Sequence, residues 1–141
     1  MIEIEENEFA RIELDRDAHI VLLVRKPVPF TPEVIERAIG DLQLSIPLRE
    51  RPRLVILQDL RESPMVRDEA AEKALMAAIP RFFAKFAARA ILMKTPVGRL
   101  QATRFASSAP VGLGELKVFL DEKEAWAWTR AEAAKLKNAA R

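Results

Sequence analysis

Several charged side chains directly follow a short apolar run, Leu54–Leu57, which has the length of a strand buried on both faces. They are Asp59, Arg61, Glu62 and Asp68. Ligands of open α/β sheets bind at the carboxyl ends of the strands, where these side chains would lie. Asp59 and Glu62 could together exchange protons or hold a magnesium ion. The structural alternative, which we favour, is that Asp59 binds loop amides and Asp68 caps a helix.

The composition leaves little other chemistry. The 141 residues include no cysteine, no tyrosine and one histidine, His19. The lack of cysteine excludes disulfides, iron–sulfur clusters and thiolate zinc sites. His19 opens a strand beside a turn without an evident partner, so we interpret it as an edge residue. We expect no catalytic residue, no metal site and no cofactor.

Basic charge is concentrated in one segment. Residues 73–114 contain no Asp or Glu and carry seven basic side chains: Lys73, Arg81, Lys85, Arg89, Lys94, Arg99 and Arg104. Residues 1–72 have a net charge of −6. The basic segment could bind an acidic membrane surface, nucleic acid, or the acidic part of a second copy of the chain. It could equally be a solvated face. Among the binding hypotheses we prefer a homodimer, and nucleic acid is the least favoured.

Aromatic side chains interleave with these bases at Phe82, Phe83 and Phe86. On a regular helix the three rings would cover more than one side, so at least one could face a partner, a lipid or a pocket. Alternatively, Pro80 redirects the helix and all three rings are internal. Pro80 should kink the helix or split it in two.

The elements that position these residues follow from periodicity and from helix-start signals. We expect strands near 10–15, 19–24, 54–57, 90–93 and 116–120. Helices are expected from Thr31, from Glu69 to Ala88, from Thr95 and from Asp121. Thr31, Asp68 and Asp121 are the predicted caps. Residues 1–8 and 137–141 are expected to be frayed ends of a single domain, 1–141.

This β-β-α-β-α-β-α-β-α order predicts a mixed, mostly parallel sheet of about five strands with an N-terminal hairpin and about four helices. No signal peptide or membrane span is apparent, so we expect a cytoplasmic protein.

Two segments carry a family resemblance. The strand Leu54–Asp59 ends in aspartate before a loop and a helix, and the chain closes with a strand and helix that include Val118–Trp128. Over roughly Phe9 to Arg130 the sequence resembles the STAS family of anti-sigma-factor-antagonist-like (SpoIIAA-like) proteins, which is similar to Sec14-type domains. The resemblance implies a fold and a role in binding rather than chemistry.

One departure from the family pattern concerns its phosphorylatable serine. Antagonists of this family carry an Asp-Ser pair at the start of the helix behind the central strand, whereas this chain has Asp68-Glu69. A serine kinase cannot phosphorylate Glu69, whose charge is permanent. The resemblance therefore implies a module without that switch.

We expect a non-catalytic regulatory module that acts through protein–protein contacts as a homodimer, with another regulatory protein, a lipid or an anionic surface as further partners. The contact residues predicted for a partner or ligand are Asp59, Arg61, Asp68, Glu69, Arg81, Phe82, Phe83, Lys85, Phe86 and Arg89. The alternatives are a small-lipid or acyl-group carrier of Sec14-like type, with the three phenylalanines lining a cavity, and an enzyme that uses Asp59 and Glu62, with or without a metal.

Overall fold

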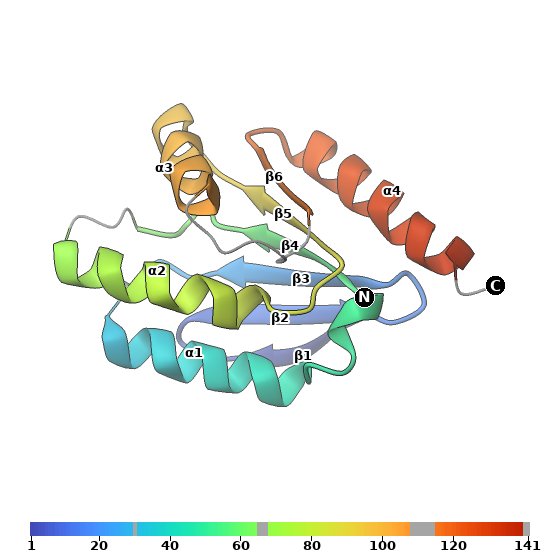
Figure 1. Cartoon of the computed structure of the whole chain (residues 1–141), viewed down its shortest axis with the longest axis horizontal. Helices are drawn as coiled ribbons and strands as arrows, with labels where there is room; N and C mark the ends of the chain where they lie inside the picture. Colours follow the sequence, from blue (N-terminus) through green and yellow to red (C-terminus); the bar gives the residue numbers. More distant parts are fainter. Residues whose placement is uncertain (30, 65–67, 108–114, 140–141) are drawn as a thin grey trace.

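Six strands form one mixed sheet. A computed structural model describes residues 1–29, 31–64, 68–107 and 115–139 (Figure 1). The strands lie side by side in chain order, and neighbours are hydrogen-bonded. They are β1 (Ile2–Glu6), β2 (Ala10–Asp15), β3 (Ile20–Arg25), β4 (Val55–Asp59), β5 (Ala88–Leu92) and β6 (Glu115–Phe119). The first two pairs are antiparallel and the other three are parallel. The predicted single α/β domain with a mostly parallel sheet is confirmed.

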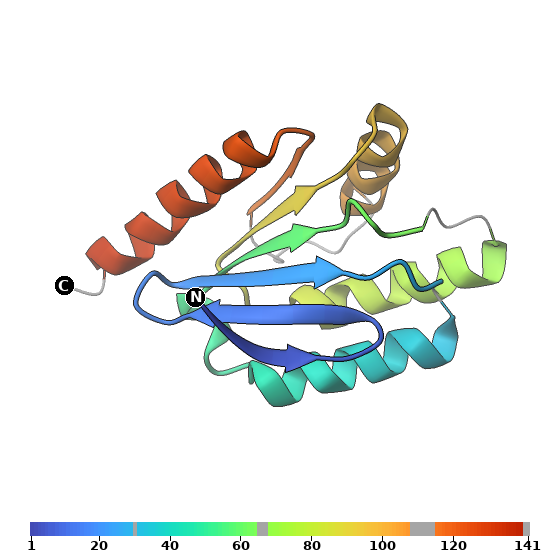
Figure 2. The same ribbon diagram turned by 180° about the vertical axis from the view of Figure 1, so that it is seen from behind.

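Four helices accompany the sheet: α1 (Pro32–Ser45), α2 (Glu69–Phe83), α3 (Pro96–Ser107) and α4 (Glu122–Ala139). The helices α1 and α2 pack side by side over one face of the sheet, and α4 packs over strands β3 to β6 on the other (Figures 1 and 2). No described helix is long and apolar enough to cross a bilayer.

Two apolar layers follow from the alternation of the strands. Ile12, Val21, Leu23 and Ile56 point toward α1 and α2, where they pack in one buried cluster. Residues of opposite parity, such as Leu57, Ala90 and Leu92, pack with Ala125 of α4. Because β4 and β5 are buried on both faces, they are almost continuously apolar.

The amino terminus differs from the prediction. Residues 2–6, expected to be frayed, form the edge strand β1, which adds a sixth strand and pairs with β2 through a register shift. Side-chain contacts anchor this end to α1: Asn7 donates to Asp41 at 2.7 Å, Ser45 donates to Glu5 at 3.1 Å, and Arg37 pairs with Glu8. The partners in the first two contacts are 34 and 40 residues apart, so local periodicity could not identify them.

The helix starts follow the predicted chemistry. Thr31 accepts a hydrogen bond from the Val34 amide, Asp68 from the Ala70 amide, and Asp121 from the Lys123 amide. Each satisfies a donor that has no partner within its helix. The helix ends differ more from the prediction. The helix α2 continues through Pro80 without being split, and α4 includes residues expected to fray after Lys137.

Candidate functional site at the strand ends

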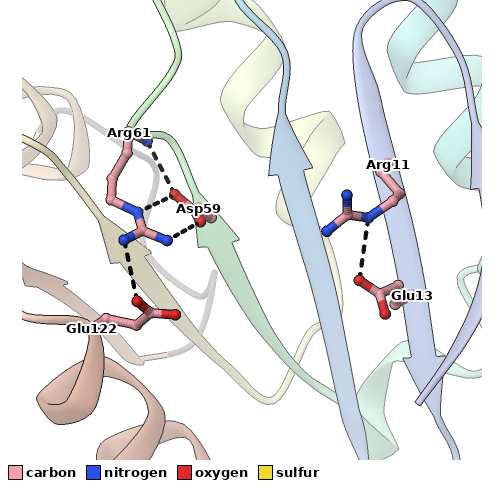
Figure 3. Close-up of polar contacts among 5 residues, drawn as sticks. All are labelled: Arg11, Glu13, Asp59, Arg61 and Glu122. Carbon is pink, nitrogen blue, oxygen red and sulfur yellow. Dashed lines mark hydrogen bonds and ion pairs between the residues drawn. The ribbon is translucent and has the colours of Figure 1, made fainter.

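Three charged residues meet at the carboxyl end of β4 (Figure 3). The Arg61 guanidinium donates to both Asp59 oxygens, from Nη2 at 2.7 Å and from Nε at 2.9 Å. Its Nη1 donates to Glu122 at 3.2 Å. The Arg61 backbone amide also donates to Asp59. Arg61 therefore bridges two carboxylates through a planar fork, the geometry for which arginine is best suited.

The sheet register places these groups together. Asp59 is the last residue of β4, in register with Leu92 at the end of β5, which is itself in register with Phe119 at the end of β6. The helix α4 begins three residues after Phe119, at Glu122. Parallel strands end at one edge, so Glu122 lies close to Asp59 although 63 residues separate them.

The charges of this cluster hold Asp59 ionised. Burial by itself would raise the pKa of Asp59, but hydrogen bonds from Arg61 and the positive charges of Arg61 and Arg11 outweigh it, and the pKa lies below its usual value. The hydrogen bond with Asp59 raises the pKa of Arg61. The Asp59 carboxylate is thus committed to an ion pair, which makes it a weak proton acceptor at neutral pH.

The predicted partnership of Asp59 with Glu62 differs from the observed one. Arg61 occupies both oxygens of Asp59, while the Glu62 side chain is exposed. Within the described residues, no group of three or more acidic, histidine or cysteine side chains could hold a metal ion.

A second ion pair lies on the same side of the sheet. Arg11 Nε donates to Glu13 at 3.2 Å, and both residues are on β2 (Figure 3). One row of the register runs from Arg11 through Val24 to Asp59, and the next pairs Glu13 with Leu22. Figure 2 shows β1 and β2 without a helix in front of them. We call Arg11, Glu13, Leu22 and Val24 the open face.

The predicted basic segment is divided by the structure. Arg81 forms a bidentate ion pair with Glu36 of α1, at 2.5 and 3.0 Å, on the surface. Lys85 is exposed and follows α2 with a positive φ of 75°. Arg89 is buried, with 3% of its surface exposed, because it points from β5 toward Phe83 of α2. Arg89 therefore cannot belong to an exposed basic surface.

The three phenylalanines belong to the core. Phe82, Phe83 and Phe86 are between 2% and 6% exposed. The Phe82 ring stacks on Phe9 at 6.1 Å between centroids. Phe86 lies beyond the end of α2, so the rings do not need to share one side of a helix. The interpretation that all three are internal is confirmed, and the expectation that one faces a partner at the surface is wrong.

The remaining predicted residues lie apart from the strand-end cluster. Asp68 and Glu69 are exposed at the start of α2, and no described hydrogen bond or ion pair joins them to Asp59. The stretch 65–67 before them lies outside the described residues. His19 has a positive φ of 62°, and its Nδ1 donates to the Arg53 carbonyl at 2.8 Å, which is a structural role.

Sequence reasoning missed Glu122, Arg11 and Glu13. The rule that selected Asp59 also applies to residues after the last parallel strand, so it could have identified Glu122. The alternation of Arg11 and Glu13 with buried residues placed them on the second face of their strand. Only the order of the strands shows that this face adjoins Asp59.

Comparison with known proteins supports the fold. No family model and no curated protein matches the chain. Among solved structures, it is similar to an uncharacterized DUF3478-family protein from Shewanella loihica PV-4, described as having a SpoIIAA-like fold. The match has a TM-score of 0.62 at 21% identity and covers 89% of this chain and 98% of that one. Together with the six-stranded mixed sheet and its four helices, this similarity shows that the chain has a SpoIIAA-like fold.

Proposed function

We propose that this protein is a non-catalytic regulatory module that acts through protein–protein contacts, and that it forms a homodimer through the open face. The observation that carries the proposal is the position of Arg11 and Glu13 on β2, a strand without a covering helix, next to Leu22 and Val24 on the adjacent strand β3. Half-buried apolar side chains lie beside an ion pair there. Protein interfaces typically combine an apolar centre with a polar rim.

A second copy is the partner that this charge pattern fits best. A twofold axis makes an interface in which residue i of one copy contacts residue j of the other, and the reverse. Arg11 and Glu13 have opposite charges and are two residues apart on one face of β2. When two β2 strands face each other in antiparallel orientation, each Arg11 meets the Glu13 of the other copy. The open face is therefore complementary to itself.

The strand-end cluster supports a binding role over a catalytic one. A general base needs a pKa near the operating pH. Asp59 has a lowered pKa, and Arg61 occupies both its oxygens. The cluster instead forms a fixed charged border, in which Asp59 is in register with Val24 of the open face.

Sedimentation equilibrium over a range of protein concentrations tests the homodimer. We expect the wild type to dimerise and the single reversals Arg11→Glu and Glu13→Arg to be monomeric, because each reversal places like charges opposite each other. The double variant Arg11→Glu/Glu13→Arg should dimerise again, because it restores both cross-pairs.

A matched control is Arg81→Glu, which reverses an exposed charge on α2, on the other side of the sheet. It should leave the dimer intact. A monomeric wild type at all concentrations, or a dimer lost in Arg81→Glu and retained in the reversals on β2, would contradict the proposal.

A further inference from the structure

Among the residues that the structure describes, three arginines are buried, and each lies over a phenylalanine ring. The distances from guanidinium carbon to ring centroid are 3.9 Å for Arg25 over Phe9, 4.9 Å for Arg51 over Phe86 and 5.0 Å for Arg89 over Phe83. All three are at most 3% exposed. A buried guanidinium is unfavourable unless hydrogen bonds or an opposite charge compensate for its lost hydration.

Backbone carbonyls compensate two of the three. Arg25 donates to the carbonyls of Phe9, Lys26 and Val28. Arg51 donates to the carbonyls of Ile46, Phe82 and Ala84, and so joins the loop after α1 to the end of α2. These two arginines have structural roles that the sequence alone would not reveal.

Arg89 is different. None of the hydrogen bonds or ion pairs found among the described residues involves its guanidinium, and its Nε is buried without an acceptor. Burial lowers its pKa, as expected for a cation without a compensating anion. The Phe83 ring offers a cation–π contact, which does not replace the hydrogen bonds of five N–H donors.

A second incompletely bonded polar side chain lies on the neighbouring strand. Gln58 of β4 is 6% exposed, and its Oε1 has no hydrogen-bond partner. The register pairs Arg89 with Ile56 and Gln58 with Ile91. Arg89 and Gln58 are therefore diagonal neighbours on the face of the sheet toward α2, a separation that long side chains can bridge.

We propose that Arg89 and Gln58 form the polar end of a binding site for a small molecule in which an oxyanion, a carboxylate or a phosphate, is attached to an apolar body. The arginine fork matches either oxyanion through two parallel hydrogen bonds. The Gln58 amide can turn to present its NH₂ group as a further donor. Phe83, Ile56 and Ile91 provide the apolar surroundings. This site is independent of the open face.

Titration of ¹⁵N-labelled full-length protein with three eight-carbon probes tests the site by NMR. Sodium octanoate and octyl phosphate carry the two oxyanions, and 1-octanol has the same chain without a charge. We expect one or both anions to shift the Nε–Hε signal of Arg89 and the Gln58 amide signals in a saturable manner. 1-Octanol should bind at least about tenfold more weakly. The anion that saturates first identifies the oxyanion.

Two variants separate a ligand role from a structural one. Arg89→Met should keep or raise the melting temperature, because it removes an uncompensated buried charge, and should weaken binding of the anion about tenfold or more. Gln58→Leu should weaken binding to a smaller extent. If neither anion shifts these signals, if 1-octanol binds equally well, or if Arg89→Met melts far below the wild type, the proposal is overturned.

Discussion

The two faces of the sheet use charge in opposite ways. Toward α1 and α2, arginines are buried over aromatic rings, and Arg25 and Arg51 are bound by backbone carbonyls. On the other side, Arg11 and Arg61 are partly exposed and paired with carboxylates. The first arrangement fixes the packing of the helices, whereas the second leaves charge available at the surface.

This comparison shows that the net charge of a segment does not indicate where the functional site lies. Within its described part, the segment richest in basic residues contributes the buried Arg89 and a surface ion pair of Arg81 with Glu36. The candidate site is instead built by residues before and after that segment, Asp59, Arg61 and Glu122. Substitutions of the aromatic core, of a buried arginine and of the strand-end cluster test this difference.

The largest effect should come from the aromatic core. Phe82→Ala should lower the free energy of unfolding by about 3–5 kcal/mol, because it removes a buried ring and leaves a cavity. Urea denaturation followed by circular dichroism measures this loss. Leu100→Ala on α3, where the side chain is 64% exposed, is the control and should change little. A small loss for Phe82→Ala would mean that the ring is not part of the core.

The next effect should come from a buried arginine. Arg51→Met should lower the free energy of unfolding by about 2–4 kcal/mol, because three backbone carbonyls lose their donor. Arg81→Gln removes a solvent-exposed ion pair and should be nearly neutral by the same denaturation assay. Equal losses in the two variants would contradict the distinction between a buried arginine bound by carbonyls and an exposed, paired one.

A smaller, pH-dependent effect is expected at Asp59. The folded-state pKa of Asp59 is lowered, so its ionised carboxylate stabilises the fold. This stabilisation is fully present above the unfolded-state pKa, about 4, and is lost as pH falls through the folded-state pKa. Asp59→Asn should therefore cost about 1 kcal/mol at pH 7 and progressively less at acidic pH. Urea denaturation of both proteins at several pH values measures the difference, and a cost that is independent of pH would contradict the ion-pair account.

The smallest effect concerns Lys85, one of the residues predicted to contact a partner. Its φ of 75° is unfavourable for a residue with a Cβ, so Lys85→Gly should raise the free energy of unfolding by up to about 1 kcal/mol. The neighbouring Ala84 has a φ of −53°, and Ala84→Gly should produce no such gain. Thermal denaturation compares the two variants. A loss in Lys85→Gly would show that its side chain makes a contact that outweighs the strain.

The fold was predictable where the evidence is local. Thr31, Asp68 and Asp121 cap their helices as expected, because capping depends on side chains only two or three residues from the amides they bind. The strand β1 was not predictable, because contacts with α1 hold it in place. Pro80 did not split α2 as expected. It lies only three residues before the end of the helix, so less than one turn follows it.

The candidate site was predictable in part for a similar reason. Asp59 and Arg61 are near neighbours in the chain and were identified together, whereas Glu122 and Arg11 join them only through the order of the strands. The burial of Arg89 was not predictable, because arginine is rarely buried and its contact with Phe83 depends on how α2 packs.

The central claim is that two copies of this protein meet through the open face, and intermolecular NOEs test it most directly. In an equimolar mixture of ¹³C-labelled and unlabelled protein, a filtered NOESY experiment records contacts between copies only. We predict intermolecular NOEs to the methyl groups of Val24 and Leu22. A dimer whose intermolecular NOEs come from α3 or α2 instead, or a sample without intermolecular NOEs at millimolar concentration, would contradict the account.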